Sequence, residues 1–123
     1  MKTGVLIVNL GTPDSPKTSD VRKYLSEFLN DPRVIDIHPI ARMLLVNLII
    51  VPFRSSKSAK LYKEIWREDG KSPLLHYSER QLELFSKLMG DKYDVQMAMR
   101  YQSPSLDIAL DHYKKQFYKK IIV

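Results

Sequence analysis

The sequence contains no cysteine among its 123 residues. This absence excludes disulfide bonds, cysteine nucleophiles, and any iron–sulfur cluster or other metal centre held by cysteines of this chain. Glycine is also scarce, with four residues, and neither G-x-G-x-x-G nor G-x-x-x-x-G-K-[ST] occurs. The sequence therefore disfavours the glycine-rich loops with which nucleotide-binding folds hold phosphate groups.

Histidine is almost as scarce, and its three residues, His38, His76 and His112, are scattered along the chain. None of them has a second histidine, aspartate or glutamate at the spacing typical of a metal site. A nucleophile elbow and an ordered Ser-His-Asp set are missing as well. We therefore expect neither a metal site nor a hydrolytic triad in this chain.

Long hydrophobic runs are also lacking. The longest apolar stretch, residues 40–53, contains Arg42 and Asn47 and falls short of the roughly 20 residues that span a bilayer. We expect that it can lie on a membrane but cannot cross one. The amino terminus runs directly into a short apolar segment with no small-residue cleavage site, which predicts a cytoplasmic protein.

Positive charge is in excess, with 20 lysines and arginines against 14 acidic residues and a net charge of +6. This balance fits an anionic partner, such as a lipid surface, a small polyanion or nucleic acid, and it equally fits simple solubility. The chain has no basic strand with interleaved aromatic residues and no recognisable reading helix, so we do not expect nucleic-acid binding.

The spacing of apolar residues predicts alternating strands and helices. The continuous apolar run at residues 4–9 is typical of a strand covered on both faces of a parallel sheet. Residues 33–37 fit a short strand or an extended connection. Three helices are expected in the first half of the chain: one from Thr18 to the Asn30-Asp31-Pro32 stop, an apolar one from Pro39 ended by Pro52, and one over 56–67. A fourth helix is expected to begin at a Ser78–Gln81 capping box and to end at Gly90. A strand over 93–99, a helix after Ser103-Pro104 and a strand over 119–123 are expected to follow. This order predicts a one-domain α/β fold with a parallel sheet flanked by helices.

Two helical faces are expected to be buried. One carries Leu82, Phe85, Leu88 and Met89; the other carries Leu106, Ala109, Leu110, Tyr113 and Phe117.

The loop over residues 10–16 follows the first strand, where ligands of parallel α/β sheets bind. One glycine and two prolines make this loop stiff. It suits the wall of a cleft for a flat or bulky ligand, or a rigid strand-to-helix connection with no ligand.

A second group of candidate residues surrounds the helix over 56–67. Arg54, Tyr62 and Ser72 could bring a guanidinium, a phenol and a hydroxyl to a ligand with carboxylates and an aromatic face. The alternative is a basic, solvated helix face with Tyr62 in the core. Arg100 and Tyr101 follow the second strand at the ligand edge of the sheet, where a ligand contact and a buried ion pair remain open.

The segment over 40–51 is apolar on nearly every side. It is either a buried core helix or an apolar lip toward a membrane or an apolar ligand.

Several blocks of the sequence, taken together, resemble the bacterial ferrochelatase family. The blocks are GVLIVNLGTPDSP, VRKYLSEFLNDPRVID, KSAKLYKEIW, GKSPLLHYSERQ and AMRYQSPS, and they follow the order of the family. The resemblance implies an enzyme that inserts ferrous iron, its substrate, into a porphyrin, with protoporphyrin IX favoured by the apolar lip. It also implies that residues 1–123 form an N-terminal, Rossmann-like half of a two-domain protein, whose C-terminal half is absent from this chain.

The same resemblance implies roles for particular residues. Leu10 would face the macrocycle, where its side chain cannot ligate a metal as the tyrosine of some relatives can. Arg54, Tyr62 and Ser72 would contact the porphyrin and its propionates, Arg100 and Tyr101 would lie at the cleft edge, and residues 40–53 would form the lip and a peripheral membrane contact. The catalytic histidine and glutamate would belong to the C-terminal half, so we expect this chain alone to be inactive and to need no cofactor. The alternative is a stand-alone basic module that binds a membrane surface or an anionic ligand.

Overall fold

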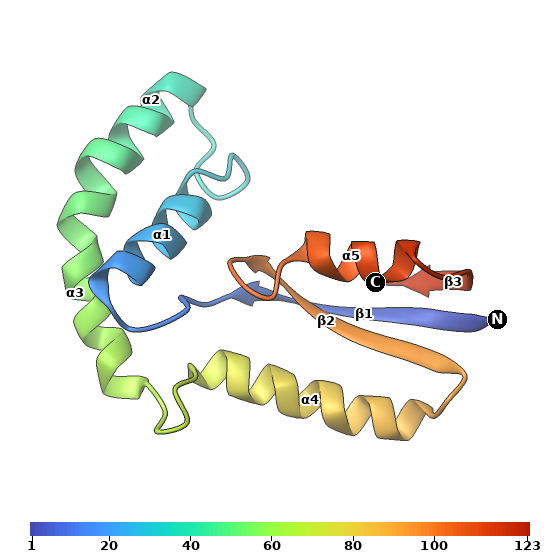
Figure 1. Cartoon of the computed structure of the whole chain (residues 1–123). Coiled ribbons are helices and arrows are strands. Elements are labelled where there is room, and N and C mark those ends of the chain that lie inside the picture. The colour runs from blue at the N-terminus through green and yellow to red at the C-terminus, as the bar shows by residue number, and fades with distance from the viewer. The chain divides into compact units, whose positions relative to one another are not determined.

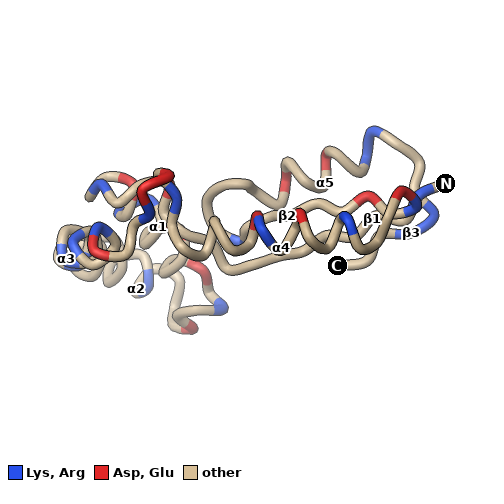
Figure 2. Tube along the Cα trace, turned by 90° about the horizontal axis from the view of Figure 1, so that it is seen from below, with Lys and Arg blue, Asp and Glu red and all other residues tan.

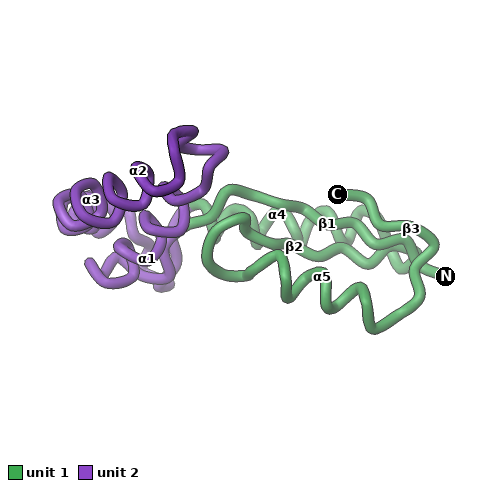
Figure 3. Tube along the Cα trace, turned by 90° about the horizontal axis from the view of Figure 1, so that it is seen from above, with its two compact units in different colours: residues 1–12, 74–123 green, residues 13–73 purple.

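The computed structural model describes residues 1–123. Its elements in chain order are β1 (Lys2–Gly11), α1 (Thr18–Leu29), α2 (Pro39–Leu44), the π-helical segment η1 (Leu45–Ile50), α3 (Val51–Ile65), α4 (Pro73–Met89), β2 (Tyr93–Tyr101), α5 (Leu106–Lys114) and β3 (Tyr118–Ile122). They form two compact units, one of residues 1–12 with 74–123 and one of residues 13–73 (Figure 3).

The first unit is built on a three-stranded parallel sheet in the order β2-β1-β3. Helices α4 and α5 lie on opposite sides of this sheet (Figure 1). The predicted α/β fold with a parallel sheet flanked by helices is therefore confirmed. Because helices lie on both faces of the sheet, the apolar run of the central strand β1 is continuous rather than alternating.

The core of this unit lies between the sheet and α5. It contains Leu6 of β1, Ala98 of β2, and Ala109 and Tyr113 of α5, all almost completely buried. The hydroxyl of Tyr113 lies 2.8 Å from the carbonyl oxygen of Val5 and 3.0 Å from that of Asp94. One buried phenol thus ties α5 to both β1 and β2, in agreement with the prediction that Tyr113 points inward.

Four predictions for this unit are wrong. The helix α4 begins at Pro73, so Ser78 lies inside it and is no capping residue. Proline suits the first turn because that turn needs no amide donor, and the buried hydroxyl of Ser78 instead accepts a hydrogen bond from Asn9. Leu88, Leu110 and Phe117 are exposed rather than buried. Phe117 leaves the helical face because α5 ends at Lys114.

The second unit packs α1 against α3. Val21 and Tyr24 of α1 are buried, as are Ser55 and Ala59 of α3. These two small residues, one turn apart, let the two helices approach closely. Helix α1 has the predicted start at Thr18, and residues 33–37 form turns and bends rather than a strand.

The apolar helix continues through Pro52, which contradicts the predicted stop there. Segment η1 is π-helical, and the amide of Val51 donates to the carbonyl of Val46, five residues back. Pro52, which has no amide proton, then lies in the first turn of α3, where a missing donor is tolerated. The result is one helical run from Pro39 to Ile65.

This run has 27 residues, and by length and composition alone it could cross a membrane. The expectation that residues 40–53 are too short to do so is therefore wrong on length, because the helix extends beyond them. Only 17% of its most apolar 18-residue window is buried. The exposed side chains are Ile40, Met43, Leu44, Leu48, Ile49 and Phe53, so the segment is not a buried core helix.

Candidate functional site

Two predicted site residues lie side by side at the carboxyl edge of the sheet. The register pairs Asn9 with Met99 and Gly11 with Tyr101, which places Leu10 beside Arg100 on neighbouring strands. Side chains alternate along a strand, so both residues share the face that Leu6 and Ala98 present to α5. The side chain of Leu10 is 48% exposed and Arg100 is also exposed. An apolar group and an arginine side chain therefore lie exposed side by side at this edge.

Tyr101 is 5% exposed, so its ring is not available at the surface beside Arg100. The guanidinium carbon of Arg100 lies 5.7 Å from the centre of that ring, within the range of a cation–π contact. The carbonyl of Tyr101 packs against Gly11. In this arrangement the ring of Tyr101 packs against Arg100, and its backbone packs against Gly11.

Asn9 is a residue of this edge that the sequence reasoning missed. Its side-chain oxygen accepts a hydrogen bond of 2.8 Å from the amide of Leu10, and its side-chain nitrogen donates to Ser78 at 3.3 Å. The side chain therefore fixes the backbone of Leu10 and links β1 to α4. A polar residue inside an otherwise apolar strand was the signal in the sequence.

In the second unit, Arg54 and Tyr62 both belong to α3. They are eight residues apart, which corresponds to about 12 Å along a helix. Arg54 is exposed, and Tyr62 is half-buried with edge-on ring contacts to Tyr24 at 6.5 Å and to Trp66 at 6.2 Å. Burial raises the pKa of Tyr62, and a hydrogen bond with Tyr24 partly opposes that rise. Tyr62 therefore serves as a neutral phenol at physiological pH.

A shallow hollow of about 400 Å³ lies on the surface of α3 and includes Tyr62. Its lining also contains Leu61 and Ile65, both of which are exposed apolar side chains. Ser58 and Glu64 complete the lining. The hollow offers an aromatic edge and two aliphatic surfaces, which is the chemistry that a flat apolar ligand needs.

Ser72 does not share this exposure. It lies just before α4 and is 2% exposed. Its burial could not be predicted from the sequence, because serine beside proline is typical of exposed turns.

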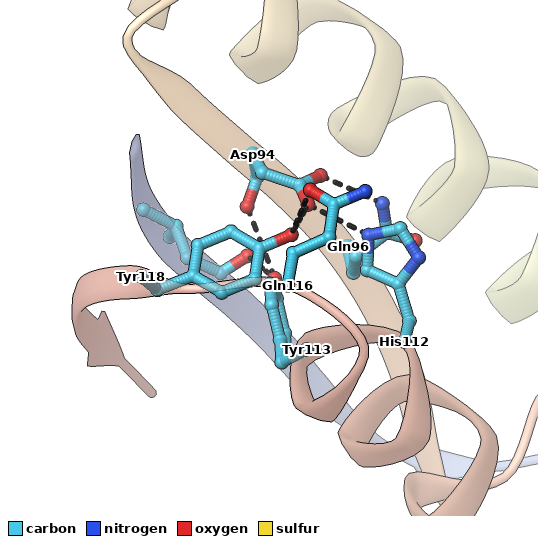
Figure 4. Close-up of polar contacts among 7 residues, drawn as sticks. Asp94, Gln96, His112, Tyr113, Gln116 and Tyr118 are labelled. Carbon is cyan, nitrogen blue, oxygen red and sulfur yellow. Dashed lines mark hydrogen bonds and ion pairs between the residues drawn. The ribbon is translucent and has the colours of Figure 1, made fainter. Parts of the chain in front are cut away.

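A polar cluster lies at the opposite, amino end of β2. The carboxylate of Asp94 accepts hydrogen bonds from Tyr118 at 2.5 Å and Gln96 at 2.9 Å, and its Oδ2 lies 2.6 Å from Nε2 of His112 (Figure 4). Burial raises the pKa of Asp94, but these three hydrogen bonds outweigh burial, and the net pKa is below its ordinary value. The bond to Asp94 raises the pKa of Tyr118 to about 12.

Each histidine has a local partner. His38 caps α2 by accepting from the amide of Ile40, His76 packs edge-on against Tyr77, and His112 pairs with Asp94. No group of three or more histidine, aspartate and glutamate side chains is placed to hold a metal ion. The sequence carried a signal for this pair. Asp94 is an acidic residue at the start of a strand, and the helix that follows this strand runs back alongside it and brings His112 near Asp94.

Comparison with known proteins adds an independent finding. The ferrochelatase family model matches residues 2–123. The ferrochelatase of Coxiella burnetii (strain RSA 493 / Nine Mile phase I) is 47% identical over 122 residues, and that of Herminiimonas arsenicoxydans is 48% identical over 125 residues; each alignment covers 99% of this chain and 34% of the relative. The ferrochelatase of Francisella tularensis subsp. holarctica is 42% identical, over 99% of this chain and 37% of the relative. The chain spans about a third of the length of these curated relatives, and it belongs to the ferrochelatase family.

Proposed function

We propose that this chain is the porphyrin-binding part of a ferrochelatase, an enzyme that inserts ferrous iron into a porphyrin in haem biosynthesis. Family membership over residues 2–123 supports the reaction class. The observation that carries the residue assignment is the adjacent, exposed placement of Leu10 and Arg100 at the carboxyl edge of the sheet. This edge is where parallel α/β sheets bind their ligands.

Each unit contributes its own contacts. In the first, Leu10 packs on the macrocycle and Arg100 pairs with a propionate. In the second, Arg54 pairs with a propionate, and the hollow beside Tyr62 accepts an edge of the macrocycle. A guanidinium binds a carboxylate with two parallel hydrogen bonds, so the arginines fix the orientation of the ligand while the apolar groups supply contact area.

The role of these contacts in the reaction is mechanical. Holding the macrocycle against a stiff wall bends it, and binding energy can support about 1–5 kcal/mol of such strain. Bending turns the pyrrole lone pairs toward the incoming ferrous ion, and two pyrrole protons leave as four nitrogens bind the metal. The groups that take those protons and deliver the iron belong to the part of the family's chain beyond this third, so this chain alone is inactive.

The exposed apolar segment over 40–53 has two roles in this proposal. It covers a porphyrin with two carboxylates, protoporphyrin IX, in preference to one with four, because an apolar lip disfavours additional charge. It also makes a peripheral contact with the cytoplasmic face of a membrane, with Arg42 and Arg54 near the headgroups. The exposure of Leu48, Ile49 and Phe53 supports this second role.

The test is a titration of protoporphyrin IX followed by absorbance and fluorescence. Arg54→Gln and Arg100→Gln are each expected to weaken binding roughly tenfold or more, because each removes a charged hydrogen-bond donor. Arg22→Gln on α1 is the matched control, since it removes an exposed arginine elsewhere. If both site variants bind the porphyrin as Arg22→Gln does, the residue assignment is wrong.

Two further measurements separate the parts of the proposal. Coproporphyrin is expected to bind more weakly than protoporphyrin IX, and metal insertion by this chain alone would contradict its inactivity. The alternative, a stand-alone module for membrane surfaces, is favoured by the same exposed segment. Vesicle binding without any affinity for porphyrin would support that alternative.

A further inference from the structure

The end of α5 and the start of β3 carry an unusual concentration of positive charge. Residues 114–120, which we call the lysine segment, contain Lys114, Lys115, Lys119 and Lys120 and no acidic residue. Lys2 of β1 is close by, because it pairs in register with Tyr118. Figure 2 shows lysine positions of α5, β3 and the start of β1 gathered at one end of this unit.

Little in the protein neutralises these charges. All four lysines of the segment are exposed. Lys114 lies 3.7 Å from Asp111 in an exposed ion pair, whereas Lys115, Lys119 and Lys120 form none. Asp94, whose carboxylate contacts Tyr118 of this segment, is already occupied by Tyr118, Gln96 and His112. The segment therefore presents its charge outward.

A large aromatic side chain lies at the middle of this charge. Phe117 is 92% exposed. The next residue, Tyr118, is fixed by its hydrogen bond to Asp94 and by an edge-on contact of 5.1 Å with the ring of Tyr113. Tyr118 thus anchors the start of β3 on the α5 side, while Phe117 stays in solvent. An exposed aromatic side chain flanked on both sides by lysines has no role in the packing of this unit.

We propose that the lysine segment with Phe117 binds the surface of an anionic phospholipid bilayer. Lysines near such a surface are attracted by its negative potential, and an aromatic ring fits the boundary between headgroups and acyl chains. A bilayer accepts Phe117 without a preformed pocket. Nucleic acid fits less well, because this end has lysines but no arginine, and so lacks the planar donors that recognise phosphate and bases bidentately.

This contact is distinct from the one proposed for residues 40–53. The lysine segment belongs to the unit of residues 1–12 and 74–123, whereas the apolar helix belongs to the other unit. The two contacts also differ in chemistry. The lysine segment depends on lipid charge and weakens with salt, whereas an apolar helix face depends on buried area.

The test is co-sedimentation of the protein with vesicles of phosphatidylcholine alone and of phosphatidylcholine mixed with phosphatidylglycerol. We expect charge-dependent binding to the mixed vesicles that falls as salt is raised. The double variant Lys119→Gln/Lys120→Gln is expected to bind roughly tenfold more weakly or worse, and Phe117→Ser severalfold more weakly. All three positions are exposed, so an unchanged melting temperature checks that the fold is intact.

Two control variants test whether the binding depends on this segment rather than on charge or apolar surface elsewhere. Arg22→Gln/Lys23→Gln removes the same charge from exposed positions of α1 and is expected to bind nearly as the wild type does. Leu48→Ser/Phe53→Ser disrupts the apolar helix face and is expected to keep the part of binding that depends on phosphatidylglycerol. The proposal is overturned if mixed vesicles are not bound, if the lysine variant binds as the wild type does, or if the α1 control loses as much.

Discussion

The ring of Tyr113 occupies the space that a side chain at Gly4 would need. A Cβ atom at Gly4 would lie 2.7 Å from Cε1 and 3.0 Å from Cδ1 of that ring. The ring cannot move away freely, because its hydroxyl is held by carbonyl oxygens of both β1 and β2. The absence of a side chain at Gly4 therefore sets how closely α5 approaches the sheet.

Gly4→Ala is expected to lower the free energy of unfolding by about 1–3 kcal/mol, because the new methyl group overpacks the core beneath α5. Urea unfolding measures the loss. The same substitution in a Tyr113→Leu background should cost clearly less, since the opposing ring is gone. Equal costs in the two backgrounds would show that Tyr113 is not the obstacle.

Gly11→Ala is expected to be more damaging, with a loss of about 3 kcal/mol or more. Gly11 has a φ of 126°, and a Cβ there would collide with the carbonyl oxygen of Tyr101, which is backbone and cannot swing aside. Gly70→Ala is the control, because Gly70 has a φ of 79° and open space around it. It should cost only about 1 kcal/mol. Thermal unfolding of the two variants gives the comparison, and similar losses would contradict it.

Asn9→Ala is expected to destabilise the protein by about 1–2 kcal/mol through the loss of its bonds to Leu10 and Ser78. Ser78→Ala removes only one of these bonds and should cost less. In the double variant the two losses should not add, because they share the Asn9–Ser78 hydrogen bond. Urea unfolding of the three variants measures the coupling, and strict additivity would argue against that bond.

The acid stability of the protein is expected to depend on Asp94. Although burial alone would raise its pKa, the hydrogen bonds to its carboxylate lower the net value in the folded state. The stabilisation is thus complete above the ordinary carboxyl pKa, about 3.9, and is lost as pH falls through the lower, folded-state pKa. Asp94→Asn should be less stable than wild type at pH 7, and the gap in melting temperature should narrow in strong acid. Asp111→Asn, which removes an exposed ion pair, is the control and should melt close to the wild type at pH 7.

The stability of the protein at alkaline pH is expected to depend on Tyr118. Its hydrogen bond to Asp94 favours the neutral phenol and raises the pKa to about 12. The stabilisation is present below the ordinary tyrosine pKa, about 10, and is lost as pH rises through about 12. Burial also raises the pKa of Tyr113 to about 12, so titration of phenolate absorbance should show two tyrosines of unusually high pKa in the wild type and one in Tyr118→Phe. A titration curve unchanged by the substitution would contradict this assignment.

The elements that local patterns control were predictable from the sequence. The apolar run of β1, the periodic face of α1 and the stop at Gly90 depend on neighbouring residues, and the structure has them as expected. The failures concern where helices begin and end. Ser78 looks like a helix cap, but α4 begins five residues earlier, at Pro73, and the Ser78 hydroxyl accepts a hydrogen bond from Asn9 instead. Pro52 looks like a stop because a π-helical turn cannot be read from composition.

Some features of the candidate site were likewise predictable from the sequence, and others were not. Leu10 and Arg100 were placed together by a topological rule, that the carboxyl ends of parallel strands share an edge. The burial of Tyr101 and Ser72 depends on tertiary packing, which residue type alone does not reveal. The Asp94–His112 pair escaped notice because its members are 18 residues apart and belong to different elements.

The position of β1 in the middle of the sheet also affects how the chain folds as it is synthesised. Strand β1 is made first, yet Thr3 pairs with Tyr93 on one side and with Lys120 on the other. Residues 13–73, a compact unit of their own, are synthesised while β1 still lacks both neighbouring strands. During that interval β1 is an apolar strand with two open edges, the kind of segment that chaperones bind and that aggregates if left uncovered.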